Sequence, residues 1–388
     1  MSAKHPTETA TSMWGERYTP PAVIAATAKS LAASGVVDQL HISDQLMNFI
    51  PPELWSPENT PMTTHMPDPD SHADPVAVLT YAIAHAPELG VTMMTDSVRR
   101  NPAEMIQTML TLANLTGGRA QFMIGAGEIK QVKPFGLKRS EGVDRMEDLF
   151  KLFHLVMDND GPIDHQGRKS SWKRGFLGAA KPHRPQLWAL GSGPRLVDLA
   201  ATYCDGICVG TPLVWADPET AAADIQRIRD IVESKGRDPD AFRFGIGCPT
   251  MIHDDPNVFD KAFDNPLVRW LACVMGRING ADWKRDGLDS PVPDDWTYFQ
   301  KLLPFDMPPG FTADALSKTT RAHCEKGLIW GTPEKVAADL QAYVDVGVSW
   351  VLPLDYLPVV LDPEDAAQSP ARSIEVCRRL KEASIPAQ

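Results

Sequence analysis

The sequence predicts an α/β fold, and three observations point to a (β/α)8 TIM barrel within that class. Short apolar runs alternate with longer amphipathic segments, which is the pattern of βα units around a parallel sheet. Eight such runs are present. Several helical segments begin with proline, whose fixed φ and missing N–H suit the first helical position. A doubly wound sheet is the alternative, because periodicity alone does not decide whether a sheet closes.

The strands and helices are expected to alternate along most of the chain. A first strand is expected within residues 9–16, and the other seven at 37–43, 89–95, 120–126, 186–192, 205–210, 242–248 and 348–354. Helices are expected at 21–34, 101–116, 143–158, 194–203, 218–235 and 333–346.

Two long segments interrupt this pattern within what we expect to be one domain over residues 1–388. Residues 46–74, here called the mouth loop, are proline-rich and follow the second strand, so a barrel would place them at its functional end. Residues 250–330, here called the insertion, follow the seventh strand and carry several tryptophans. We expect the insertion to be partly helical and to cover the site, and an oligomer interface or additional core is an equally good and compatible interpretation.

Composition and charge exclude several classes of function. The formal charge of −12 disfavours nucleic acid as a partner, and no cluster of lysine and arginine offsets it. No apolar run approaches the roughly 20 residues of a membrane helix, so neither membrane insertion nor a signal peptide is expected, and the expected location is cytoplasmic. The six cysteines lack histidines at ligand spacing, so they predict buried thiols and no metal site.

Candidate site residues lie at the ends of the strands, because the loops that follow barrel strands converge on one pocket. These residues are Asp44 and Gln45 after the second strand, Thr92, Met93, Met94 and Thr95 in the third, Gly125, Ala126, Gly127 and Glu128 after the fourth, and Gly191, Ser192 and Gly193 before the helix at 194–203. The last three could cradle a phosphate, since glycine permits close approach and a helix start offers unpaired amides. An ordinary turn with a serine cap fits the same residues.

Four segments together resemble the bacterial luciferase-like superfamily: RRNPAEMIQTMLTLANLTGGRAQFMIGAGE, GVDRMEDLFKLFHLVM, PQLWALGSGPRLVDLAATYCDGICVG and WGTPEKVAADLQAYVDVGV. Within it, the chain is similar to the branch that uses coenzyme F420, a deazaflavin, and that includes F420-dependent glucose-6-phosphate dehydrogenase and phthiodiolone ketoreductase. The resemblance covers residues 15–250 and 329–380.

This resemblance implies a barrel that binds the deazaflavin at its strand ends, often as a homodimer. It assigns the following roles by position: Gly191, Ser192 and Gly193 as a phosphate-binding turn, Asp44 near the cofactor, Gly125, Ala126 and Gly127 as a turn beside the ring, and Glu128 over the position of hydride transfer. Thr95, at the end of the third strand, is a further cofactor-binding candidate. Thr92 and Met93 match a non-proline cis peptide that bulges behind the ring in this branch.

The chain departs from the branch at one important position. The aspartate after the second strand is commonly followed by a histidine that exchanges a proton with substrate, and here that position is Gln45, which can orient a carbonyl but cannot titrate. We therefore expect the acid to be Glu128, which would need a pKa raised towards neutral by burial to transfer a proton, or secondly His65 in the mouth loop.

The remaining histidines are given structural or surface roles. His41 is expected to be a packing histidine that points with Ser43. Surface positions are the expectation for His72, His253 and His323.

The expected function is an F420-dependent oxidoreductase that transfers hydride between the deazaflavin C5 and an uncharged organic substrate, with a carbonyl or activated C=C favoured over a sugar phosphate. The segment after the sixth strand has Leu213 and Trp215 where a basic phosphate-binding residue would lie, which suggests an apolar or neutral substrate. Two alternatives stay open. One is an FMN-dependent monooxygenase of the same superfamily, and the other is a protein that binds a flavin or deazaflavin without turnover.

Overall fold

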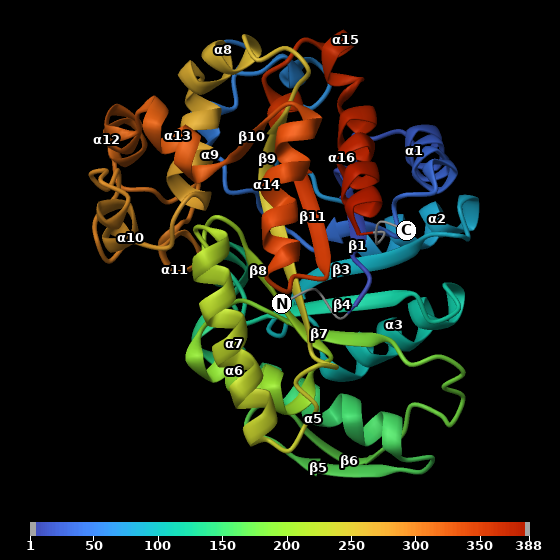
Figure 1. Ribbon diagram of the computed structural model, residues 1–388. Coiled ribbons are helices and arrows are strands. Elements are labelled where there is room, and N and C mark those ends of the chain that lie inside the picture. Colours follow the sequence, from blue (N-terminus) through green and yellow to red (C-terminus); the bar gives the residue numbers. More distant parts are fainter. Residues whose placement is uncertain (1–4, 385–388) are drawn as a thin grey trace.

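A closed barrel of eight parallel strands forms the centre of the computed structural model, which describes residues 5–384 (Figure 1). The first four and last four residues of the domain expected over 1–388 therefore lie outside the described residues. The strands follow one another around the barrel as β1 (Glu8–Ser12), β2 (Gln39–Ser43), β3 (Gly90–Asp96), β4 (Ala120–Gly125), β7 (Gln186–Leu190), β8 (Gly206–Gly210), β9 (Arg243–Ile252) and β11 (Trp350–Asp355). Parallel pairing of β11 with β1 closes the barrel, which confirms the TIM-barrel prediction and excludes the doubly wound sheet.

Each barrel strand lies on a segment that the sequence predicts, and three further strands were not predicted. β10 (Ile329–Gly331) pairs with the far end of β9, outside the closed barrel. β5 (Ile163–Gln166) and β6 (Ser171–Gly175) form a separate antiparallel hairpin. The hairpin strands are mostly polar and β10 has three residues, so none of them has the apolar run on which the prediction depends.

All six predicted helices are present, with ends within about two residues of the expected ones. They are α1 (Pro21–Ser34), α3 (Pro102–Leu115), α5 (Gly142–Asp158), α6 (Pro194–Tyr203), α7 (Pro218–Ser234) and α14 (Pro333–Asp345). Two outer helices, α2 (Pro75–His85) and α16 (Ser369–Ala383), were not predicted. The sequence of α2 is apolar almost throughout, so it shows no helical period.

Large side chains fill the barrel interior and leave a floor at its mouth. Trp188 and Trp350 are fully buried in the barrel interior. A Cβ on Gly206 would come within 2.9 Å of the Trp188 ring, so glycine at that position makes room for the tryptophan. Met94, Leu190 and Leu354 pack on this cluster and are only partly buried. These three residues lie towards the carboxyl ends of β3, β7 and β11, and we call them the apolar floor.

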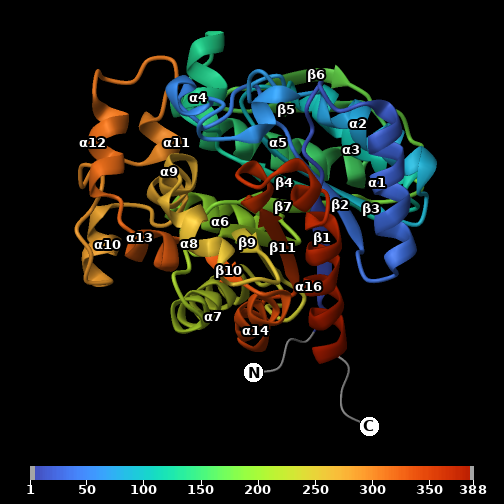
Figure 2. The same ribbon diagram turned by 90° about the horizontal axis from the view of Figure 1, so that it is seen from above.

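A second hydrophobic core lies apart from the one that joins the barrel to its outer helices. It combines mouth-loop residues such as Phe49 and Trp55 with insertion residues such as Phe259 and Trp270. The Trp270 indole N–H donates to the carbonyl oxygen of Phe49 at 2.9 Å. The insertion is helical in part, as expected, and contributes α8 (Val258–Asp264), α9 (Pro266–Met275), α10 (Gly280–Arg285), α11 (Tyr298–Lys301), α12 (Phe311–Lys318) and α13 (Arg321–Gly327). Seen from above, these helices gather on the side of the barrel opposite α1, α2 and α3 (Figure 2).

Candidate functional site

Glu128 lies three residues beyond the end of β4 and immediately precedes the short helix α4 (Ile129–Val132). Gly127 has φ +89°, a conformation that favours glycine and turns the chain out of the strand. The Glu128 carboxylate forms an ion pair with the ammonium group of Lys130, whose side chain is only 3% exposed. It also accepts a hydrogen bond from the hydroxyl of Tyr298, which belongs to α11 of the insertion. The insertion therefore reaches the residue that the sequence placed at the mouth.

The charge state of Glu128 differs from the expectation. Burial alone raises the pKa of Glu128, but the charge of Lys130 and the hydrogen bonds from Lys130 and Tyr298 lower it below the usual value of 4.5. The condition that proton transfer by Glu128 would need, a pKa raised towards neutral, is therefore not met, because the effects of these partners outweigh burial. Burial and the Glu128 charge raise the pKa of Tyr298, so the phenol stays protonated and donates to an ionised carboxylate.

Asp44 and Thr95 come together in a buried cluster of charges. The Asp44 carboxylate accepts from Thr95 at 2.7 Å and Arg100 at 2.9 Å and pairs with Arg99 at 3.3 Å. Burial raises the pKa of Asp44, and the charges and hydrogen bonds of the arginines outweigh that effect and lower it. The hydrogen-bonding capacity of Asp44 is thus used within the protein, and it holds the ends of β2 and β3 together.

Thr92 and Met93 lie in regular strand, away from the mouth. The only cis peptide bond within residues 5–384 is Thr211–Pro212, so the predicted cis bond between Thr92 and Met93 is wrong. Both residues keep the parallel register with β2 and β4, which leaves no bulge. The Thr92 hydroxyl donates to Gln39 inside the barrel, and Met93 packs in the core between strands and helices.

The turn from β7 to α6 is open to solvent on the side where a ligand could approach. Gly191 has φ +129°, and a Cβ on Gly193 would meet no atom within 4 Å. Gly193 is the N-cap of α6, and no side chain caps the helix there. Free amides at the start of α6 and the space in front of them suit a phosphate group. Leu190, which precedes this turn, belongs to the apolar floor.

A pocket of about 330 Å³ lies at the carboxyl ends of β1, β2 and β11. Its lining combines apolar side chains (Trp14, Ile42, Phe49, Met62 and Leu354) with polar ones (Ser12, Ser43, Gln45, Asn48 and Asp355). The position of Gln45 is fixed through the two residues that follow it, whose backbone is hydrogen-bonded to Gln131. The Gln131 amide of α4 accepts from the backbone N–H of Leu46 at 2.7 Å and donates to the carbonyl oxygen of Met47 at 2.7 Å. The sequence analysis missed Gln131, because nothing local indicates so distant a contact.

Asp355, at the end of β11, has the most unusual carboxyl group in this pocket. Burial raises its pKa to about 6, even though it accepts hydrogen bonds from the N–H groups of Ile252 and Leu357 and from the Ser369 hydroxyl. The next residue, Tyr356, makes edge-on ring contacts with Trp14 at 5.6 Å and Phe49 at 6.1 Å. The rule that selected the other strand ends would also have selected Asp355.

The histidines divide differently from the expectation. His65 is exposed at the end of the short helix η2 (Pro61–Thr64) and does not line the pocket, so it lies outside the site. His41 is confirmed as a packing residue that points with Ser43: its ring contacts the hydroxyls of Ser12 at 3.1 Å and Ser43 at 3.4 Å, and burial lowers its pKa to about 3. The surface positions expected for His72, His253 and His323 are wrong, because each is buried or nearly so.

Two other expectations are corrected by the packing. Trp215 is 1% exposed, and its indole N–H donates to the Asp224 carboxylate of α7 at 2.9 Å. It therefore lies in the core outside the barrel and gives no information about the polarity of the substrate. Neither it nor Leu213 lines the pocket.

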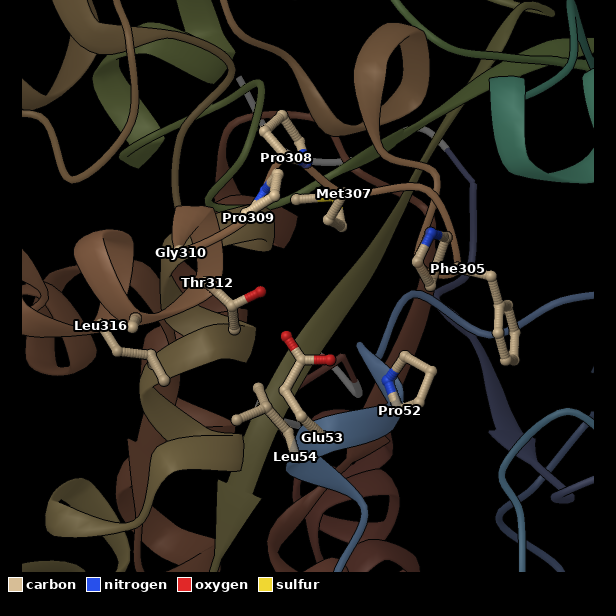
Figure 3. A pocket seen from close by; sticks show the side chains of 12 residues that line it. Pro52, Glu53, Leu54, Phe305, Met307, Pro308, Pro309, Gly310, Thr312 and Leu316 are labelled. Carbon is tan, nitrogen blue, oxygen red and sulfur yellow. The ribbon is translucent and has the colours of Figure 1, made fainter.

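A larger and shallower hollow of about 530 Å³ lies between the mouth loop and the insertion. Figure 3 shows Pro52, Glu53 and Leu54 on one side of it and Met307, Pro308 and Pro309 on the other. No candidate site residue predicted from the sequence lines it.

Comparisons with known proteins agree with this geometry. The sequence profile of the family described as luciferase-like monooxygenase matches residues 53–349. A phthiodiolone/phenolphthiodiolone dimycocerosates ketoreductase from Mycobacterium kansasii is 25% identical over 324 residues, which is 81% of this chain and 86% of the relative.

Two solved structures share the fold. An F420-dependent secondary alcohol dehydrogenase in complex with an F420–acetone adduct has a TM-score of 0.70 at 17% identity, covering 97% of this chain and 99% of that one. The long-chain alkane monooxygenase LadA has a TM-score of 0.66 at 16% identity, covering 98% of this chain and 92% of that one. No helix in residues 5–384 has the length and apolar character needed to cross a membrane.

Proposed function

The chain belongs to the luciferase-like monooxygenase family, and from this premise we propose that it is an F420-dependent oxidoreductase that reduces or forms an uncharged carbonyl or activated C=C bond. When bound, the deazaflavin would supply hydride exchange at its C5 atom. The name of the ketoreductase relative supports a ketone as the substrate.

One observation carries the proposal: a phosphate-sized turn, an apolar floor and an apolar pocket adjoin one another at the mouth. Gly191, Ser192 and Gly193 would hold the phosphate with the first amides of α6, and Leu190 continues from this turn onto the floor where a flat ring would rest. The pocket at β1, β2 and β11 would take the substrate.

Arg139 offers a second point of fit for an anionic cofactor. Its Nε atom is buried without a hydrogen-bond partner among the described residues, and its guanidinium lies 5.5 Å from the Phe299 ring of the insertion. A buried N–H donor without a partner costs free energy unless a ligand or a water accepts its hydrogen bond. The negative charge of a phosphorylated cofactor would satisfy it.

The site residues divide into binding and orienting roles in this proposal. Ionised Glu128 would accept a hydrogen bond from the ring and fix its position, with Gly125, Ala126 and Gly127 forming the turn beside it. Asp44 and Thr95 would position the mouth by tying β2 to β3. Gln45 would donate its amide N–H to the substrate oxygen, since it cannot supply a proton.

An FMN-dependent monooxygenase is the second candidate, because the matched family carries that description and LadA shares the fold. The same turn and floor would accept FMN. The two cofactors differ in chemistry, since a deazaflavin has carbon in place of the flavin N5 and reacts poorly with oxygen.

A fluorescence titration with F420 and, separately, with FMN tests the proposal. We expect F420 to bind in the micromolar range or tighter and FMN to bind weakly, with reduction of a ketone by reduced F420 and no oxygen uptake. A Gly193→Val variant should weaken F420 binding, because its side chain would occupy the open space before α6, and Gly161→Val is the matched control, since a Cβ there also meets no atom within 4 Å and the backbone is not left-handed. Preferential binding of FMN together with oxygen uptake would overturn the assignment.

A further inference from the structure

Glu16 and His72 form a buried pair that joins the chain after β1 to the end of the mouth loop. The His72 Nδ1 atom lies 3.0 Å from a Glu16 carboxylate oxygen, and the two side chains are 11% and 5% exposed. The backbone segments that carry the two residues pair in antiparallel fashion. The N–H of Arg17 donates to the carbonyl oxygen of Ser71 at 2.7 Å, and the N–H of Ala73 donates to the carbonyl oxygen of Gly15 at 2.6 Å. This ladder fixes the orientation of both side chains.

Each member of the pair keeps one buried atom without a partner. Among the described residues, nothing is hydrogen-bonded to the second Glu16 oxygen or to the His72 Nε2 atom. Both residues line the 330 Å³ pocket together with Gln45. Because a carboxylate can only accept, Nδ1 carries the hydrogen of the contact, and Nε2 is left to face a ligand. Buried polar atoms are almost always satisfied, so these two indicate a polar ligand group.

The other titratable groups of the mouth are less suited to deliver a proton. Glu128 has a lowered pKa and is paired with Lys130. Asp355 uses its oxygens on the N–H groups of two residues and on the Ser369 hydroxyl. His65 lies outside the pocket. His72 alone combines a position in the pocket with a free ring nitrogen.

We infer that His72 is the catalytic acid that donates a proton from Nε2 to the substrate carbonyl oxygen, with Glu16 as the positioning residue that fixes its tautomer. The inference rests on the proposed carbonyl reduction and supplies the proton that Gln45 cannot. The carbonyl carbon would receive the hydride that the cofactor supplies, the C=O π pair would move onto oxygen, and that oxygen would take the Nε2 proton of the His72 imidazolium, which leaves a neutral ring with its hydrogen on Nδ1. The products are a secondary alcohol and oxidised cofactor, and solvent returns a proton to His72.

Several charged groups face this pair and would share in its titration. The Asp70 carboxylate lies close enough to interact with both His72 and Glu16, and burial raises its pKa. Asp68 interacts with Asp70 from the same loop. The Arg17 guanidinium donates to the His72 carbonyl oxygen at 2.6 Å. A pH profile is therefore informative only beside a variant that removes His72 itself.

Single-turnover reduction of 2-octanone by reduced F420 measures the step directly. We expect His72→Gln to slow it by about 10²- to 10⁴-fold, the usual contribution of a general acid, with the Kd for F420 unchanged. The pH limb that reports loss of this proton should also disappear. His85→Gln, on the exposed outer face of α2, is the matched control and should match the parent protein. A His72→Gln protein that reacts as fast as the control would overturn the inference.

Two nuclear magnetic resonance measurements test the inference without turnover. In cofactor-free protein with ¹⁵N-labelled histidine, the neutral His72 ring should carry its hydrogen on Nδ1, and Glu16→Ala should release the ring into a mixture of tautomers. With 2-octanone labelled at its ¹³C carbonyl, binding should move the carbonyl signal further downfield in the parent protein than in His72→Gln, where only the Gln45 amide would donate to the oxygen.

These readouts separate the two proposals. Should the protein reduce no ketone, the proposed function fails, and the inference about His72 is then decided by the carbonyl signal alone. A signal that moves equally in the parent and in His72→Gln, or a parent ring with its hydrogen on Nε2, contradicts the role of His72 whatever the activity.

Discussion

The carboxylates on the two sides of the barrel mouth have pKa values shifted in opposite directions. At the ends of β2, β3 and β4, Asp44 faces two arginines and Glu128 faces Lys130, and both pKa values are lowered. At the end of β11, Asp355 is hydrogen-bonded only by neutral donors, and burial raises its pKa to about 6. The pKa values therefore move in opposite directions, because the charge of the nearest partner decides which form is favoured. Asp44 and Glu128 therefore stay ionised near neutral pH, and we call their side the fixed-charge side. Asp355, on the other side, gains or loses a proton in that range.

The largest change in unfolding free energy is expected from removing the Asp44 carboxylate. Asp44→Ala removes one of the two carboxylate partners of the buried Arg99, which keeps its ion pair with Asp96, so we expect a loss of about 3 kcal/mol of unfolding free energy, the lower end of the cost of breaking a buried pair. Urea unfolding at pH 7 measures it. Asp74→Asn is the control: it also pairs with Arg100, but it is 54% exposed and keeps its helix-capping oxygen, so a change below about 1 kcal/mol is expected.

The pH dependence of this contribution has a defined sign. The folded-state pKa of Asp44 lies below its ordinary value of 3.8, so its stabilisation is complete above that value and is lost as the pH falls through the folded pKa. Equal losses in Asp44→Ala at pH 7 and at pH 2 would contradict the comparison of the two sides.

An intermediate effect of opposite sign is expected at Asp355. Its folded pKa of about 6 exceeds the ordinary 3.8, so the folded state binds the proton more tightly and the ionised group destabilises the protein as pH rises from 4 to 7. Asp355→Asn should remove this dependence. Relative to the parent, the variant should gain about 2 to 3 kcal/mol between pH 4 and pH 7. Unfolding curves of both proteins across this range, with no such divergence, would show that Asp355 is not distinct from Glu128.

The smallest change in unfolding free energy is expected from removing the hydrogen bond between Tyr298 of the insertion and Glu128. Tyr298→Phe removes one hydrogen bond to the partly exposed Glu128 carboxylate and should cost about 1 kcal/mol, while the Glu128 pKa rises. Chemical denaturation measures the stability, and infrared spectroscopy of the carboxylate measures the pKa. Tyr81→Phe, at an exposed position on α2, should change neither.

The sequence was sufficient for the barrel because its strands and helices have strong local periods. Strand ends selected Glu128, the glycine turn at 191–193 and Gln45, which line or adjoin the mouth. The positions of Thr92 and Met93 were missed, since these two residues lie four and three residues before the end of the regular strand β3 and are fully buried. The charge state of Glu128 and the burial of His72 were missed for a different reason. The lowered pKa of Glu128 depends first on Lys130, two residues further on, whose side-chain direction the sequence does not indicate, and then on the distant Tyr298. The burial of His72 depends on Glu16, far away in the chain, and no local pattern encodes that contact.

The shared core of the mouth loop and the insertion has a consequence for how the protein can diversify. Trp270 and Phe49 belong to one packed cluster that is separate from the core of the barrel. A change of volume in either segment must be matched in the other, whereas the barrel beneath can stay as it is. The two segments should therefore be inherited, exchanged or transplanted as one unit, and a chimera that swaps only one of them is expected to leave a cavity or a clash above an intact barrel.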